Sequence, residues 1–147
     1  MAARAKPHHS CESDMAVHAQ RSLQGLRVLL VEDEALILLM TEGMLQEIGC
    51  RLFGAASTLG EAMSMVQEDL PDVAVLDVNL RGEMSFAFAE LLHRRNVPVL
   101  FLTGYDAPGA EQIWGRFPKL QKPCDASDLK QALLHLLDKS DKGSSIR

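Results

Sequence analysis

The sequence predicts an α/β protein with a single domain, in which helices connect the strands of a five-stranded parallel sheet. Short apolar runs alternate five times with segments of helical length and periodicity. Parallel strands need crossover connections of this length, so the alternation favours a parallel sheet. The chain has 147 residues, 47% of them hydrophobic and 24% charged, which suits one sizeable core and leaves no room for a second module.

Three strands and two helices are predicted in the first half of the chain. The apolar run LRVLLV is long enough for a strand that is buried on both faces. In the helix that follows it, Leu36, Met40, Met44 and Ile48 recur at every fourth position, so we expect this row to face the core. The predicted strands are 26–31, 51–56 and 72–76, and the predicted helices are 34–48 and 58–68.

The second half continues the alternation, with one weak point. Pro108, Gly109 and Gly115 leave room for only a short, degenerate fourth helix around 110–114. The final helix is clearly amphipathic, because leucines recur along one side of it. The predicted strands are 97–102 and 117–121, and the two longer predicted helices are 84–95 and 127–139.

The ends of the chain lack this pattern. Residues 1–24 are small, polar and charged, so we expect a flexible leader before the domain at 25–140 and a flexible tail at 141–147. No output domain follows residue 140 in the sequence, so we expect any response to pass through protein contact. The leader holds His8, His9, Cys11 and His18, which lack the paired spacing of a zinc site.

Charge and composition exclude several classes of protein. A net charge of -5 disfavours direct binding to nucleic acid or to anionic membranes. We find no apolar run of membrane-spanning length and no apolar core of a secretory signal in the sequence. Cys11, Cys50 and Cys124 are odd in number and widely spaced, which suits reduced thiols. We therefore expect a cytoplasmic protein.

Polar residues follow four of the five predicted strands. Glu32 and Asp33 follow the first strand, Asp77 the third, Thr103 the fourth and Lys122 the fifth. Each has a plain alternative, such as a helix cap, a turn or a solvated loop lysine. Because the carboxyl ends of parallel strands meet at one edge of a sheet, we expect these side chains to converge.

The converging carboxylates favour a magnesium site that supports phosphoryl chemistry. Neighbouring carboxylates repel one another, and a cation offsets that cost. Magnesium takes oxygen ligands and keeps several waters, so two or three carboxylates with a backbone carbonyl suffice. Asp77 could then act as a nucleophile that forms an acyl phosphate, with Lys122 and Thr103 neutralising or binding the phosphoryl oxygens.

With these residues the chain resembles the receiver domains of bacterial two-component response regulators. The resemblance covers about residues 25–140 in the right order and spacing. It is carried by VEDE at 31–34, LDVNLRGE at 76–83, FLTGY at 101–105 and QKP at 121–123. The resemblance implies a single-domain, doubly wound, flavodoxin-like sheet of order 2-1-3-4-5. PVLFLTGY at 98–105 also resembles the FATGUY subgroup of stand-alone receivers, although Leu102 replaces its usual alanine.

The resemblance implies a role for each site residue. Asp77 would accept the phosphoryl group from a phosphohistidine of a sensor histidine kinase or a phosphotransfer protein. Asp33, Asp77 and the Asn79 carbonyl would hold Mg²⁺, with Glu32 acting directly or through water. Thr103 and Lys122 would contact the phosphoryl group, and the peptide bond between Lys122 and Pro123 would be cis.

The same resemblance describes a phosphoprotein rather than a conventional enzyme. It implies self-catalysed phosphotransfer and autodephosphorylation, a downstream protein effector, and a monomer or weak homodimer. The usual aromatic switch position holds Lys119, so Tyr105 is the candidate replacement, and Cys124 stands where phenylalanine is common. We therefore expect signalling through ordering of 104–117, with Thr103, Lys122 and Pro123 also part of the switch.

The sequence leaves three other functions open. A haloacid-dehalogenase-like phosphatase needs a second acid two residues after the nucleophile, where this chain has Asn79. A nucleotide-binding module needs glycines after the first strand, where the chain reads VEDEAL. A phosphorylation-independent interaction domain would not require the site residues that this chain retains.

Overall fold

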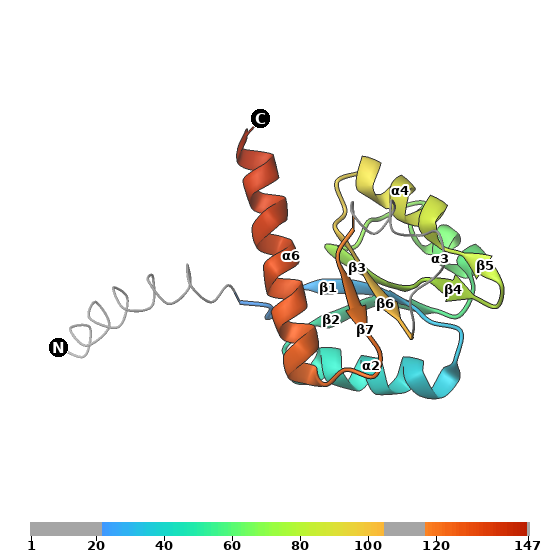
Figure 1. Ribbon diagram of the computed structural model, residues 1–147. Helices are drawn as coiled ribbons and strands as arrows, with labels where there is room; N and C mark the ends of the chain where they lie inside the picture. The colour runs from blue at the N-terminus through green and yellow to red at the C-terminus, as the bar shows by residue number, and fades with distance from the viewer. Residues whose placement is uncertain (1–21, 105–116, 147) are drawn as a thin grey trace.

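The structure is a computed structural model that describes residues 22–104 and 117–146. A five-stranded parallel sheet forms its centre, with strand order β2-β1-β3-β6-β7. Strands β6 and β7 are the fourth and fifth strands of this sheet along the chain, so the observed order corresponds to 2-1-3-4-5. The predicted strand order and the doubly wound fold are therefore confirmed. Figure 1 shows helices on both sides of this sheet.

The described elements follow the predicted alternation closely. The sheet strands are β1 (Arg27–Val31), β2 (Arg51–Ala56), β3 (Val73–Asp77), β6 (Val99–Thr103) and β7 (Lys119–Gln121). The helices are α2 (Ala35–Glu47), α3 (Leu59–Met65), α4 (Phe86–Arg94) and α6 (Ala126–Ile146). A small antiparallel hairpin, β4 (Asn79–Leu80) and β5 (Glu83–Met84), stands apart from the main sheet.

Two hydrophobic cores lie on opposite faces of the sheet. Successive side chains of a strand point to opposite faces, so each central strand contributes to both cores. In β1, for example, Leu29 and Val31 belong to the core beneath α3 and α4. Val28 and Leu30 belong to the core beneath α2 and α6. Burial on both faces explains why the central strands are continuous apolar runs rather than alternating ones.

Helix α2 differs from its prediction in the face that it buries. Leu36 and Met40 are 70% and 58% exposed, so the predicted core-facing row is wrong over the first half of the helix. Thr41 and Leu45 are the buried residues instead. Leucine and methionine occur almost all around this helix, so its apolar periodicity alone cannot select one face.

Other differences concern element boundaries and the hairpin. The predicted helix at 84–95 begins only at Phe86, because the preceding residues form β4 and β5. Helix α6 continues to Ile146, so the predicted end of the helix at residue 139 is too early. The predicted short helix at 110–114 lies outside the described residues. Among the described helices, we find none that is both long and apolar enough to cross a membrane.

Candidate functional site

The site lies at the carboxyl edge of the sheet, where the strands deliver their last side chains. Asp77 is the last residue of β3, and Glu32 directly follows β1. Leu30 and Val75, two residues earlier on each strand, face the core beneath α2 and α6, so alternation turns Glu32 and Asp77 toward the same face. Glu32 is 1% exposed and Asp77 is 8% exposed. Two carboxylates are therefore buried side by side.

Lys122 bridges these two carboxylates. Its Nζ lies 3.0 Å from Glu32 Oε1 and 3.4 Å from Asp77 Oδ2. The second oxygen of Glu32 accepts a hydrogen bond from the backbone N–H of Glu34 at 3.1 Å. The lysine follows β7 and is 90 residues from Glu32 in sequence, so only the parallel sheet brings the two together. The contact confirms the predicted convergence of these three side chains.

Burial sets the protonation behaviour of the site. Desolvation raises the pKa of Glu32 to about 7, against the opposing effects of its hydrogen bonds from Glu34 and Lys122. Desolvation also raises the pKa of Asp77, although the charge of Lys122 opposes this. For Lys122 desolvation lowers the pKa, but the Glu32 hydrogen bond and the two negative charges outweigh it, so the pKa rises. The charge of Lys122 therefore does not fully offset the cost of burying both carboxylates in their ionised form.

This imbalance predicts how the stability of the metal-free protein depends on pH. The folded state binds a proton on Glu32 more tightly than the unfolded chain does, because the pKa rises from 4.5 to about 7. The resulting stabilisation is complete below pH 4.5 and is lost as the pH rises through about 7. We expect this group to lower the free energy of unfolding by at most about 3 kcal/mol across that range.

Urea unfolding in the presence of a chelator at several pH values measures this effect. Glu32→Gln should flatten much of the fall, and a smaller fall from Asp77 should remain. Glu61→Gln is the control, because Glu61 is exposed and its pKa is lowered by hydrogen bonds from Ser57. An unchanged pH dependence in Glu32→Gln would contradict the assignment.

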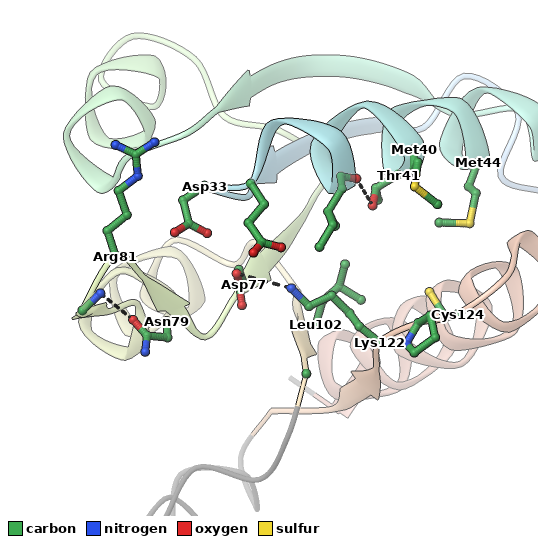
Figure 2. A pocket seen from close by; sticks show the side chains of 15 residues that line it. Asp33, Met40, Thr41, Met44, Asp77, Asn79, Arg81, Leu102, Lys122 and Cys124 are labelled. Carbon is green, nitrogen blue, oxygen red and sulfur yellow. Dashed lines mark hydrogen bonds and ion pairs between the residues drawn. The ribbon is translucent and has the colours of Figure 1, made fainter.

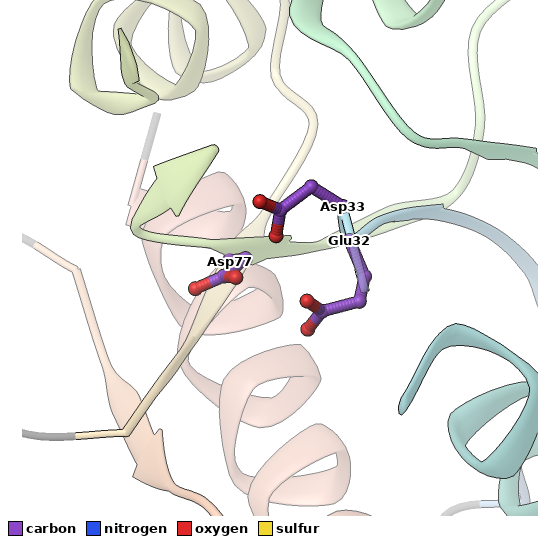
Figure 3. A group of neighbouring side chains, drawn as sticks. All are labelled: Glu32, Asp33 and Asp77. Atoms are coloured by element: carbon purple, nitrogen blue, oxygen red, sulfur yellow. The ribbon is translucent and has the colours of Figure 1, made fainter. Parts of the chain in front are cut away.

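Three carboxylates form a group that fits a divalent cation. One oxygen from each of Glu32, Asp33 and Asp77 lies within 4.8 Å of the others. Figure 3 shows Asp33 and Asp77 pointing toward a common space, with Glu32 beside them. An all-oxygen set of carboxylates suits magnesium, which prefers hard oxygen ligands. The donor set therefore fits the magnesium ion that the sequence predicts.

The hairpin after β3 holds the remaining predicted ligand in place. The Asn79 side-chain Oδ1 accepts a hydrogen bond from the Gly82 N–H at 2.7 Å (Figure 2). Arg81 and Gly82 have φ values of 56° and 88°, which suit the two-residue turn between β4 and β5. The side chain of Asn79 therefore closes a turn, which leaves its backbone carbonyl as the group predicted to bind metal.

Ser85 is a site residue that the sequence prediction missed. Its side chain is fully buried, and its hydroxyl lies 2.6 Å from the carbonyl oxygen of Asp77 and 3.1 Å from that of Val78. It precedes α4 but makes no side-chain cap on that helix. The hydroxyl instead ties the end of the hairpin to the backbone of Asp77. A serine before a predicted helix suggests a cap, so the sequence alone gave no signal of this role.

We expect Ser85→Ala to destabilise the protein by about 2 kcal/mol, because it removes the hydroxyl that bonds a buried carbonyl. It should also weaken magnesium binding, since the backbone at 77–79 loses an anchor. Chemical denaturation and magnesium titration measure the two effects. Ser57→Ala is the control, because the Ser57 hydroxyl bonds to Glu61 at the surface, away from the site. Unchanged magnesium affinity in Ser85→Ala would show that the hydroxyl has no positioning role.

The other predicted residues are placed as follows. Thr103 is the last residue of β6 and is 5% exposed, directly after Leu102, which pairs with Asp77 across the two strands. Its backbone carbonyl accepts a hydrogen bond from the Lys122 N–H at 2.7 Å. The peptide bond between Lys122 and Pro123 is cis, as predicted. Tyr105 and most of the proposed switch segment 104–117 lie outside the described residues.

A search against models of known families finds a match. The model of the response regulator receiver domain matches residues 28–134. The match spans most of the chain, including all the described site residues. The chain therefore belongs to the response regulator receiver domain family of two-component systems.

Similar proteins agree with this membership. The transcriptional regulatory protein PdtaR of Mycobacterium tuberculosis is 33% identical over 111 residues, which cover 73% of this chain and 54% of PdtaR. The phyllosphere-induced regulator PhyR of Methylorubrum extorquens is 32% identical over 98 residues, covering 63% of this chain and 37% of PhyR. The chain thus spans about half or less of the length of these curated relatives.

Solved structures also share the fold. The solution structure of SdrG from Sphingomonas melonis Fr1 is 37% identical, with a TM-score of 0.68, and covers 77% of this chain and 97% of SdrG. A CheY-like receiver domain from Methanospirillum hungatei JF-1 is 23% identical, with a TM-score of 0.72, over 82% of this chain and 99% of that chain. The second likeness supports the fold alone.

Proposed function

We propose that this receiver domain accepts a phosphoryl group on the carboxylate of Asp77 in a magnesium-dependent reaction and signals by contact with other proteins. The bridge from Lys122 to Glu32 and Asp77 carries the proposal. It brings a candidate nucleophile, a cation and a second carboxylate together at one point. Phosphoryl transfer depends mainly on such positioning and charge neutralisation.

Each residue has a separate task in this proposal. A carboxylate oxygen of Asp77 attacks the phosphorus, and Lys122 and Thr103 contact the phosphoryl oxygens. Asp33, Asp77 and the carbonyl of Asn79 would hold magnesium, with Glu32 acting directly or through water. When bound, magnesium supplies positive charge that offsets the carboxylates and the phosphoryl group. The same site would catalyse autodephosphorylation, so the chain is a phosphoacceptor rather than a conventional enzyme.

Membership of the family supports a proposal for the classes of partner. We propose that a sensor histidine kinase or a histidine phosphotransfer protein donates the phosphoryl group and that a downstream protein receives the signal. Relatives bear names such as transcriptional regulatory protein and anti-anti-sigma factor. Those names describe the relatives, and this chain spans only part of their length. The proposal therefore names classes of partner and no single protein.

The phosphatase alternative receives no support from the site. A haloacid-dehalogenase-like reaction needs a second acid at the position of Asn79. The Asn79 side chain is instead engaged with the Gly82 N–H. A steady-state assay on phosphate esters should therefore show almost no turnover.

The direct test is phosphorylation by acetyl phosphate with and without magnesium, followed by intact mass measurement. We expect one phosphoryl group per chain only when magnesium is present. Beryllofluoride, which mimics an acyl phosphate, should bind under the same condition. Absence of both reactions in folded protein with magnesium would refute the proposed function.

A further inference from the structure

An open cleft of about 540 Å³ lies over Asp77 and extends well beyond it. Its charged end includes Asp33 and Asp77, and Lys122 reaches into it from one side. Figure 2 shows the cleft continuing past Lys122 along α2, where Met40 and Met44 line it. The cleft thus has a charged end and an apolar end on either side of the lysine.

The apolar end has two facing walls. Helix α2 provides one wall through Ile37, Met40 and Met44. Pro123 and Cys124, which directly follow Lys122, provide part of the other wall. Methionine side chains are flexible and polarisable, so such a wall adapts to apolar groups of different shape. The volume of the cleft lies within the range of about 300–1,000 Å³ that is typical of sites for small molecules.

The proposed phosphoryl transfer gives a role to both the charged end and the apolar end of the cleft. This step rests on the proposed function. A phosphoryl donor must bring its phosphorus to Asp77 while its leaving group is still attached. The phosphoryl group fits the charged end, where Lys122 and magnesium would neutralise it. The leaving group must then lie elsewhere in the same cleft, and the wall beyond Lys122 is apolar.

We propose that the cleft accepts acyl phosphates with apolar acyl groups longer than acetyl, with the acyl chain lying between α2 and the Pro123–Cys124 segment. In the reaction an oxygen of the Asp77 carboxylate forms a bond to phosphorus. The bond between phosphorus and the acyl oxygen breaks, and the acyl group leaves as a carboxylate with the electron pair of that bond. No proton is transferred, and no oxidant or reductant is needed.

A series of acetyl, butyryl and hexanoyl phosphate tests this substrate class. The leaving carboxylates differ little in basicity, so changes in rate report on chain binding rather than on intrinsic reactivity. We expect kcat/KM for phosphorylation of the full chain with magnesium to rise roughly twofold for each added methylene. Complete burial of a methylene would give about fourfold, and the cleft is open to solvent. The rise should come chiefly from a lower KM.

Two neighbouring residues of α2 provide matched variants. Met40 is 58% exposed and lines the cleft, whereas Leu39 is 65% exposed and does not line it. Met40→Gln keeps the length of the side chain but makes its end polar, so it should flatten the dependence on chain length. Leu39→Gln makes a comparable change outside the cleft and should preserve the dependence. Both positions are exposed, so both variants should fold.

The outcomes separate this inference from the proposed function. Phosphorylation by all three donors at equal efficiency overturns the inference and leaves the proposed function standing. A chain-length dependence that persists in Met40→Gln, or is lost equally in Leu39→Gln, overturns the placement of the acyl chain. Failure of all donors, acetyl phosphate included, overturns the proposed function and this inference with it.

Discussion

Asp77→Asn should abolish phosphorylation by acetyl phosphate, with a loss on the order of 10³-fold or more. The amide has nearly the shape of the carboxylate but has no anionic oxygen to attack phosphorus. Intact mass measurement with magnesium should show one added phosphoryl group in the wild-type protein and none in the variant. Hydroxylamine should remove the group from the wild-type protein, because it cleaves acyl phosphates.

Stability distinguishes a chemical loss from a folding failure in this variant. Burial raises the pKa of Asp77, so its ionised form is costly in the metal-free protein. Asp77→Asn should therefore unfold at an equal or higher urea concentration than the wild type at neutral pH. Asp69→Asn is the matched control, because the Asp69 side chain is 67% exposed and pairs with Arg27 away from the site. Phosphorylation that persists in Asp77→Asn would place the acceptor elsewhere.

The sheet could be predicted from the sequence for a physical reason, and so could the convergence of the polar residues that follow its strands. Strands buried on both faces must be apolar throughout, so runs such as 26–31 and 97–102 stand out from their surroundings. Parallel order then places Glu32, Asp77 and Lys122 at one edge, whatever their separation in sequence. The contacts of Lys122 with both carboxylates confirm this step.

The buried face of α2 could not be predicted in the same way. A helix with one apolar stripe reveals its buried side, but this helix carries leucine, isoleucine or methionine on most of its surface. Packing against α6 and the sheet selects Thr41 and Leu45 for burial. Of the apolar residues that remain exposed, Met40 lines the cleft, whereas Leu36 and Leu39 do not. The apolar residues of this helix are therefore divided between the core, the cleft and the exposed surface.

The hairpin and Ser85 were missed because local signals are ambiguous there. Two-residue strands such as β4 and β5 are too short to show a period of two. The hydroxyl of Ser85 bonds to the carbonyl of a residue eight positions earlier, rather than to its own helix. Only the tertiary arrangement of β3, the hairpin and α4 makes that bond available.

Lys122→Met should give the second large effect, one that grows with pH. The variant keeps an apolar stem but removes the cation that lies between Glu32 and Asp77. At pH 5.5 Glu32 is protonated in the folded protein, because its pKa is raised to about 7, so the missing charge should cost less there than at a higher pH. At pH 8.5 ionisation of the two carboxylates is opposed by their burial and no longer offset by the lysine, so the cost is larger. Breaking a buried ion pair costs about 3–5 kcal/mol, so we expect a loss of about 3 kcal/mol there.

Urea unfolding at both pH values in a chelator measures this difference. Magnesium should restore part of the lost stability at pH 8.5, since a divalent cation also offsets the carboxylates. Phosphorylation by acetyl phosphate should fall about 10²-fold or more, because a preorganised cation at the phosphoryl group is lost. Lys130→Met, at an exposed position of α6, should change stability by less than about 0.5 kcal/mol. Equal destabilisation of Lys122→Met at both pH values would show that Lys122 stabilises by packing and not by neutralising the carboxylates.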